Sequence, residues 1–153
     1  MDEFRELYQE VILDHNKNPQ NFRIMADASH ISEGRNPLCG DHYTIYVKIE
    51  KGILRDISFH GSGCAISKAS ASIMTSVLIG KKIEDATNLF KLFQQVVTGE
   101  IKPMDNLDSL GKLAAFGGVA EFPVRVKCAI LSWHAMNSAL QGGGQPVSTE
   151  EEK

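Results

Sequence analysis

The sequence predicts an α+β fold: a single domain in which a small antiparallel sheet packs on a cluster of helices. Apolar and polar residues alternate from residue 42 to residue 60 with one break at Lys51 and Gly52, which predicts a β-hairpin. Apolar residues recur at helical spacing before and after this hairpin. No repeat or linker divides the 153 residues, so we expect one domain over residues 1–141 and a disordered tail over 142–153.

The first element is predicted to be a helix over residues 2–15. Its apolar side chains recur every three or four residues and form one stripe: Phe4, Leu7, Tyr8, Val11 and Ile12. Pro19 cannot continue a helix, so the chain is expected to leave the helix before it. Residues 16–38 are predicted to be irregular, with a short edge strand near residues 28–32.

The hairpin and the later helices follow from local patterns. Residues 42–50 alternate as a half-buried strand does, and residues 53–61 return as its partner. A helix rich in small residues is expected to begin after a cap at Ser62 or Gly63 and to end at Gly80. Further helices are predicted over residues 83–97, briefly after Asp105, and over residues 125–140.

The composition argues against several classes of function. The net charge is −3 and the basic residues are scattered, so nothing predicts nucleic-acid binding. No apolar run approaches the roughly 20 residues that span a bilayer, and the acidic amino terminus does not resemble a secretory signal. We therefore expect a cytoplasmic protein that does not bind membranes.

The three cysteines are the strongest candidates for chemistry. An odd number of cysteines in an intracellular protein indicates free thiols, nucleophiles or metal ligands. Cys39 precedes the first hairpin strand, Cys64 follows the second, and Cys128 lies near the start of the last helix. Strand starts and helix starts can meet at one end of such a fold. With Asp41 as an oxygen ligand, three thiolates would form a tetrahedral zinc set.

Local charge favours ionised thiols, although other interpretations remain open. Helix amino termini stabilise thiolates at Cys64 and Cys128, and Arg125 and Lys127 act in the same direction. Any single cysteine could equally be a core residue, and the wide cysteine spacing matches no short zinc-finger pattern. A cysteine hydrolase would need a histidine base, and the sequence has no local Cys–His signature.

Four motifs carry a resemblance to a known family. They are "LYQEVILDHNKNPQNF", "NPLCGD", "GSGCAIS" and "RVKCAILSW". In this order they resemble the U-type iron–sulfur cluster assembly proteins, the group of IscU, SufU and the NifU amino-terminal domain, over residues 4–141. Lys127 stands where the IscU branch has a histidine, and residues 121–125 differ from its Leu-Pro-Pro-Val-Lys stretch. The segment over residues 99–118 and the wording of "GSGCAIS" are instead similar to the SufU branch.

The resemblance implies a ligand set and an activity. It assigns the metal ligands to Cys39, Asp41, Cys64 and Cys128, and the metal to Zn²⁺. It also implies a sulfurtransferase-like protein that stimulates a SufS-type cysteine desulfurase, accepts its persulfide sulfur and serves downstream iron–sulfur assembly proteins. Cys39 is the expected sulfur acceptor because Pro37 and Gly40 flank it in a loop, and Arg125 is expected to stabilise the anionic sulfur.

Two alternatives to this function stay open. The protein could be a scaffold that assembles and transfers a labile [2Fe–2S] cluster, because thiolates suit both metals. It could also be an adaptor whose metal is purely structural, which a closed and immobile site would favour.

Overall fold

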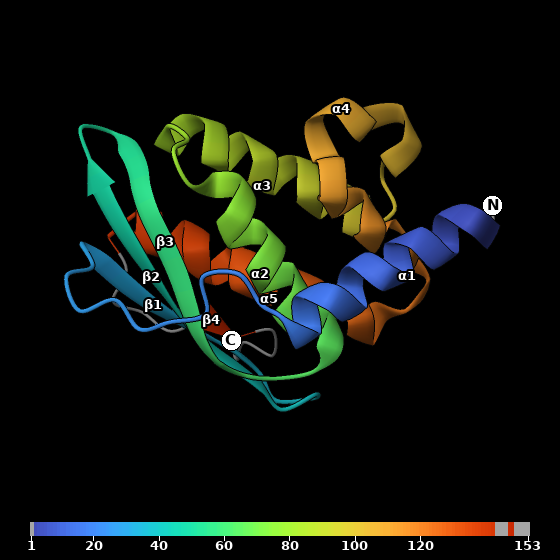
Figure 1. Cartoon of the computed structure of the whole chain (residues 1–153), viewed down its shortest axis with the longest axis horizontal. Coiled ribbons are helices and arrows are strands. Elements are labelled where there is room, and N and C mark those ends of the chain that lie inside the picture. The colour runs from blue at the N-terminus through green and yellow to red at the C-terminus, as the bar shows by residue number, and fades with distance from the viewer. Residues whose placement is uncertain (1, 143–146, 149–153) are drawn as a thin grey trace.

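The computed structural model describes residues 2–142 and 147–148 and confirms the predicted α+β fold. The sheet lies on one side and the helices cover one of its faces (Figure 1). The helices are α1 (Asp2–Lys17), α2 (Ala65–Leu78), α3 (Ile83–Val97), α4 (Leu107–Leu110) and α5 (Pro123–Leu140), with 3-10 helices η1 (Pro103–Asn106) and η2 (Gly111–Glu121). The strands are β1 (His30–Asn36), β2 (Asp41–Glu50), β3 (Ile53–Ser62) and β4 (Val147–Ser148).

The sheet has the strand order β3-β2-β1-β4. The predicted hairpin is confirmed as β2 and β3, which pair antiparallel. Its turn residues Lys51 and Gly52 both have positive φ, 53° and 76°, as tight hairpin turns require. The strand expected near residues 28–32 is present as β1, which pairs antiparallel with β2 and extends to Asn36, further than predicted. It is not an edge strand over its whole length, because the two-residue β4 pairs with its other side.

The core forms where α2 and α5 pack against the sheet. Alternate residues of β2 point into it, and Trp133 of α5 is fully buried with them. Gly34 of β1 permits close approach of α5, because a Cβ at this position would lie 3.1 Å from Leu131. This close packing carries the first turns of α5 to the end of β1.

Two local predictions need correction. The second helix begins at Ala65 and its N-cap is Cys64, so neither Ser62 nor Gly63 is the cap. The last helix begins at Pro123 instead of residue 125, because proline is well suited to the first turn of a helix.

The structure describes only part of the predicted tail. Val147 and Ser148 pair in parallel with Gly34 and Arg35 of β1. Residues 143–146 and 149–153 of the predicted tail lie outside the described residues.

In the described part of the chain, no helix has both the length and the apolarity to cross a bilayer.

Candidate metal centre

The four predicted ligands lie in a turn, at the start of a strand and near the starts of two helices. Cys39 lies in the turn between β1 and β2, and Asp41 is the first residue of β2. Cys64 caps α2, directly after β3, and Cys128 lies in the second turn of α5. The pairing of β2 with β3 joins His42 to Ser62, so the entry to α2 lies beside Asp41.

The structure brings three of these side chains into one cluster. The ligand atoms of Cys39, Asp41 and Cys128 all lie within 4.8 Å of one another. The sulfur atoms of Cys39 and Cys128 are 3.2 Å apart, and the cysteines are free thiols. Cys128 and Asp41 are buried, with 0% and 2% of their surfaces exposed, whereas Cys39 is half-buried. The cluster therefore has a buried half and an accessible half.

Cys64 lies beside this cluster, but it is not one of the three residues whose ligand atoms all lie within 4.8 Å of one another. Its sulfur accepts the backbone N–H of Ser67 at 3.5 Å, which is the N-cap bond of α2. Its own N–H donates to Asp41 Oδ1 at 2.8 Å. Cys64 is half-buried and lines the same cavity as Cys39 and Cys128.

The cysteine thiols differ in acidity. The pKa of Cys64 is lowered to about 6, chiefly by a hydrogen bond from Cys128 and also by hydrogen bonds from Ser67, against the opposing effect of burial. The same interaction raises the pKa of Cys128, because Cys128 holds the proton that the pair shares, and burial raises it further. In the metal-free protein Cys64 is thus the more readily ionised thiol of this pair.

Donors that the sequence analysis missed surround the carboxylate of Asp41. Ser67 donates its hydroxyl hydrogen to Oδ1 at 3.0 Å, and Asn36 donates to Oδ2 at 3.0 Å. Tyr43 lies behind Ser67, with 3.2 Å between the two hydroxyl oxygens. Burial raises the pKa of Tyr43 to about 12. A local signal for Ser67 exists, since it lies three residues after Cys64, the position that an N-cap side chain contacts. Asn36 opens the "NPLCGD" motif.

A cavity of about 470 Å³ opens onto the thiols. Its wall includes the three cysteines, the exposed Arg125 of α5, and three residues of α1: Gln9, Ile12 and Leu13. Arg125 thus lies where the sequence analysis expected a basic side chain. The site is accessible from outside, which a purely structural metal does not require.

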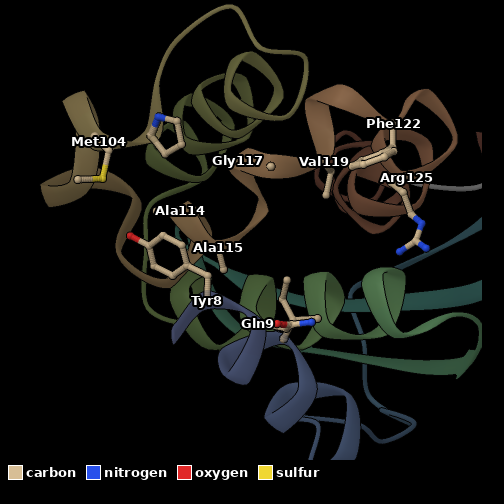
Figure 2. Close-up of a pocket in the computed structure, with 12 residues that line it drawn as sticks. Tyr8, Gln9, Met104, Ala114, Ala115, Gly117, Val119, Phe122 and Arg125 are labelled. Atoms are coloured by element: carbon tan, nitrogen blue, oxygen red, sulfur yellow. The ribbon is translucent and has the colours of Figure 1, made fainter. Parts of the chain in front are cut away.

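A second, mostly apolar groove of about 550 Å³ adjoins this cavity. The two share Gln9, Ile12 and Arg125. Met104 and Arg125 lie at opposite ends of the groove, with Tyr8 and Gln9 of α1 between them (Figure 2). The helix α1 therefore forms a wall of both hollows.

The donor set fits a divalent metal ion. An ionised carboxylate and thiolates are costly to bury unless a positive charge offsets them. Asp41 and Cys128 are buried together, and the sulfur and oxygen donors converge. Zinc takes this combination of thiolate and carboxylate ligands in proteins.

Three comparisons relate the chain to known proteins. Residues 7–129 match the family described as NifU-like N-terminal domain. The chain is 42% identical to the zinc-dependent sulfurtransferase SufU of Bacillus subtilis, covering 88% of this chain and 89% of that protein. It is 38% identical to the iron–sulfur cluster assembly scaffold protein IscU of Thermotoga maritima, covering 94% and 99%. A crystal structure of an iron–sulfur cluster assembly scaffold protein for the SUF system from Fervidobacterium islandicum superposes with a TM-score of 0.80 at 33% identity, covering 86% and 94%.

Proposed function

The chain belongs to the family of NifU-like N-terminal domains, and on that premise we propose that it is a zinc-dependent sulfurtransferase. It accepts sulfur from the persulfide of a SufS-type cysteine desulfurase and supplies it for iron–sulfur cluster assembly. One observation carries this proposal: Cys39, Asp41 and Cys128 converge within 4.8 Å at a cavity that Cys64 also lines.

The proposed zinc ligands are Cys39, Asp41, Cys64 and Cys128. Bound zinc supplies a positive charge that keeps the thiols deprotonated. The chain's own residues prepare the site for this charge. Asp41 is held by donors on both oxygens, and Cys64 is already the more acidic thiol of its pair.

Cys39 is the proposed sulfur acceptor. Its thiolate attacks the outer sulfur of the desulfurase persulfide. A new S–S bond forms on Cys39, the S–S bond of the desulfurase persulfide breaks, and the desulfurase cysteine leaves as a thiolate. The sulfur keeps its oxidation state, so no oxidant is required. Arg125, on the wall of the same cavity, stabilises the terminal negative charge of the Cys39 persulfide.

The surface around the cavity suits a protein partner. Leu13 and Leu38 expose 56% and 57% of their surfaces, and Leu13 lines the cavity while Leu38 precedes Cys39. Val124, next to Arg125, is 46% exposed. Apolar side chains gathered beside a reactive site are typical of a docking surface, and a desulfurase must bring its persulfide to Cys39.

A second candidate function is a scaffold for a transient [2Fe–2S] cluster. The 38% identity to a protein described as an IscU scaffold favours it, and thiolates bind both metals. Metal analysis of anaerobically purified protein separates the two. Zinc without visible absorbance supports the sulfurtransferase, and iron with visible absorbance supports the scaffold.

The test of the proposed function is sulfur transfer from a SufS-type desulfurase supplied with cysteine and a reductant. Wild-type protein should raise alanine production, and mass spectrometry should find an added sulfur atom on Cys39. Cys39→Ala should accept no sulfur, whereas Cys39→Ala that accepts it as fast as wild type refutes the proposal. The zinc content of each variant is measured in parallel, so that loss of the acceptor is distinguished from loss of the metal.

A further inference from the structure

We propose that Asn36 is a positioning residue for the metal centre, which orients Asp41 and Cys128 and restricts Asp41 to binding the metal through Oδ2. The inference deepens the proposed function and relies on the metal site described there. Asn36 is the last residue of β1 and is fully buried, with 0% of its surface exposed.

The side-chain amide of Asn36 bridges two proposed ligands. Its Nδ2 donates to Asp41 Oδ2 at 3.0 Å and to Cys128 Sγ at 3.3 Å. An amide nitrogen carries two N–H donors, so these contacts account for both. The opposite amide orientation would turn a carbonyl oxygen toward a carboxylate and a sulfur, and the repulsion excludes it.

These contacts decide how Asp41 can bind a metal. Its Oδ1 accepts a hydrogen bond from the Cys64 N–H at 2.8 Å. The one hydroxyl hydrogen of Ser67 has three acceptors in reach, and the carboxylate oxygen at 3.0 Å is a stronger acceptor than the Cys64 carbonyl or the Tyr43 hydroxyl. Since a carboxylate oxygen has about two acceptor positions, Oδ1 is fully used. Its Oδ2 accepts from Asn36 and keeps one position. Asp41 would therefore hold a metal through Oδ2 alone.

Asn36 acts on the buried half of the centre. Asp41 and Cys128 expose 2% and 0% of their surfaces, whereas Cys39 and Cys64 are half-buried. If Cys39 leaves the metal to take up sulfur, the ligands oriented by Asn36 must retain it. The Asn36 amide thus keeps Asp41 and Cys128 in place while Cys39 moves.

The experiment compares Asn36→Ala with wild type and with Asn18→Ala. The control is matched, because Asn18 also donates its amide to a carboxylate, that of Asp14 at 3.4 Å, but on the exposed end of α1. Zinc affinity is measured by competition with a chromophoric chelator. We expect Asn36→Ala to bind zinc about 10- to 100-fold more weakly and Asn18→Ala to match wild type.

A spectroscopic measurement separates positioning from general loss of structure. A hydrogen bond to a thiolate lowers the energy of its lone pairs, so removing the Asn36 donor should shift the thiolate-to-cobalt absorption of the Co²⁺ protein to longer wavelength. Denaturant unfolding of the metal-free variants shows whether the fold is kept. Unchanged zinc affinity and an unchanged cobalt spectrum in folded Asn36→Ala overturn the inference.

A measurement on unmodified protein keeps the inference testable if Asn36→Ala does not fold. In wild type loaded with a spin-active cadmium isotope, a side-chain amide proton of Asn36 should show scalar coupling to the metal through the N–H···S bond. Absence of this coupling overturns the inference. Failure of wild type to bind zinc or cadmium at all refutes the proposed function instead, so the two failures are distinguishable.

Discussion

The metal centre has two sides that the backbone builds differently. On the turn side, Cys39 lies between Leu38, which is 57% exposed, and Gly40, which has φ of +74° and no atom within 4 Å of a Cβ position. On the helix side, Cys128 is fully buried in α5 and Cys64 caps α2.

The comparison shows how identical thiols can receive different tasks. Helices packed on a sheet hold their side chains more precisely than turns do. A turn with open space around it can move without disturbing the core. This difference supports the proposal that the sulfur acceptor lies on the turn side and the metal anchors lie on the helix side. The predictions below test this division in order of decreasing effect.

The largest effects are expected from serine substitutions on the two sides. Cys39→Ser should lower sulfur uptake more than about 100-fold, as loss of a covalent nucleophile does, yet keep zinc better than Cys128→Ser. Cys128→Ser should lose more zinc and unfold at lower denaturant, since the buried half of the site is affected. Chelator competition and urea unfolding check both variants. Better zinc retention in Cys128→Ser than in Cys39→Ser contradicts the division.

A methyl group at Gly63 should damage the helix side. Its Cβ would lie 2.5 Å from Asp41 Oδ1 and 2.6 Å from Ser67 Oγ, so these groups must shift. We expect Gly63→Ala to lower the free energy of unfolding by about 1–3 kcal/mol and to weaken zinc binding. Gly118→Ala is the control, because nothing lies within 4 Å of that Cβ position. Equal stability and zinc affinity in the two variants would disprove the steric argument.

Gly40→Ala should affect the turn side through the backbone alone. Alanine is disfavoured at a φ of +74°, which costs about 1–2 kcal/mol in the free energy of unfolding. Gly40→Asn should cost less, because asparagine tolerates this conformation. Denaturant unfolding of the metal-free proteins measures both. If the two variants are equally destabilised, backbone strain is not the cause.

The smallest effect concerns the attachment of α1, which lines the cavity on the helix side. His15 is buried. Its Nδ1 lies 2.7 Å from Ser72 Oγ, and its Nε2 lies 3.4 Å from Lys112 Nζ. Burial and then Lys112 lower the pKa of His15, against a smaller opposing effect of Asp14. Because the unfolded chain binds the proton more readily, the free energy of unfolding should fall as the pH drops below about 6.5.

Replacing the imidazole tests this linkage. In the metal-free protein, His15→Gln should reduce the fall in the free energy of unfolding between about pH 7 and pH 5, as measured by urea unfolding. It should not remove the fall completely, because burial also lowers the pKa of His134 and acts in the same direction. An unchanged pH dependence in His15→Gln would show that His15 does not link pH to stability.

Local patterns were sufficient for most of the fold. The helix over residues 83–97 was predicted with its observed bounds, and the hairpin was predicted to within a residue or two. Both follow from periodicity, which depends on neighbours in the chain. The start of α2 was misplaced because Cys64 is an unusual N-cap, and its sulfur takes the place of the expected hydroxyl.

The candidate ligands could be named from the sequence, although their roles remain predictions. Cys39, Asp41, Cys64 and Cys128 were all expected to meet at one end of the fold. The structure places the ligand atoms of three of them within 4.8 Å of one another, with Cys64 beside them. Asn36 and Ser67 were missed as partners of Asp41. Nothing in their local sequence states which carboxylate they contact.

The amino-acid sequence by itself determined most of the elements, the family and the four candidate metal ligands, since each depends on residue type and short-range spacing. Tertiary structure alone decided which thiol is buried and which is accessible, and how the oxygens of Asp41 are occupied. These properties depend on contacts such as that between Asn36 and Cys128, across a sequence separation of 92 residues. Only the packing of α5 on β1 creates that contact, and no local pattern encodes it.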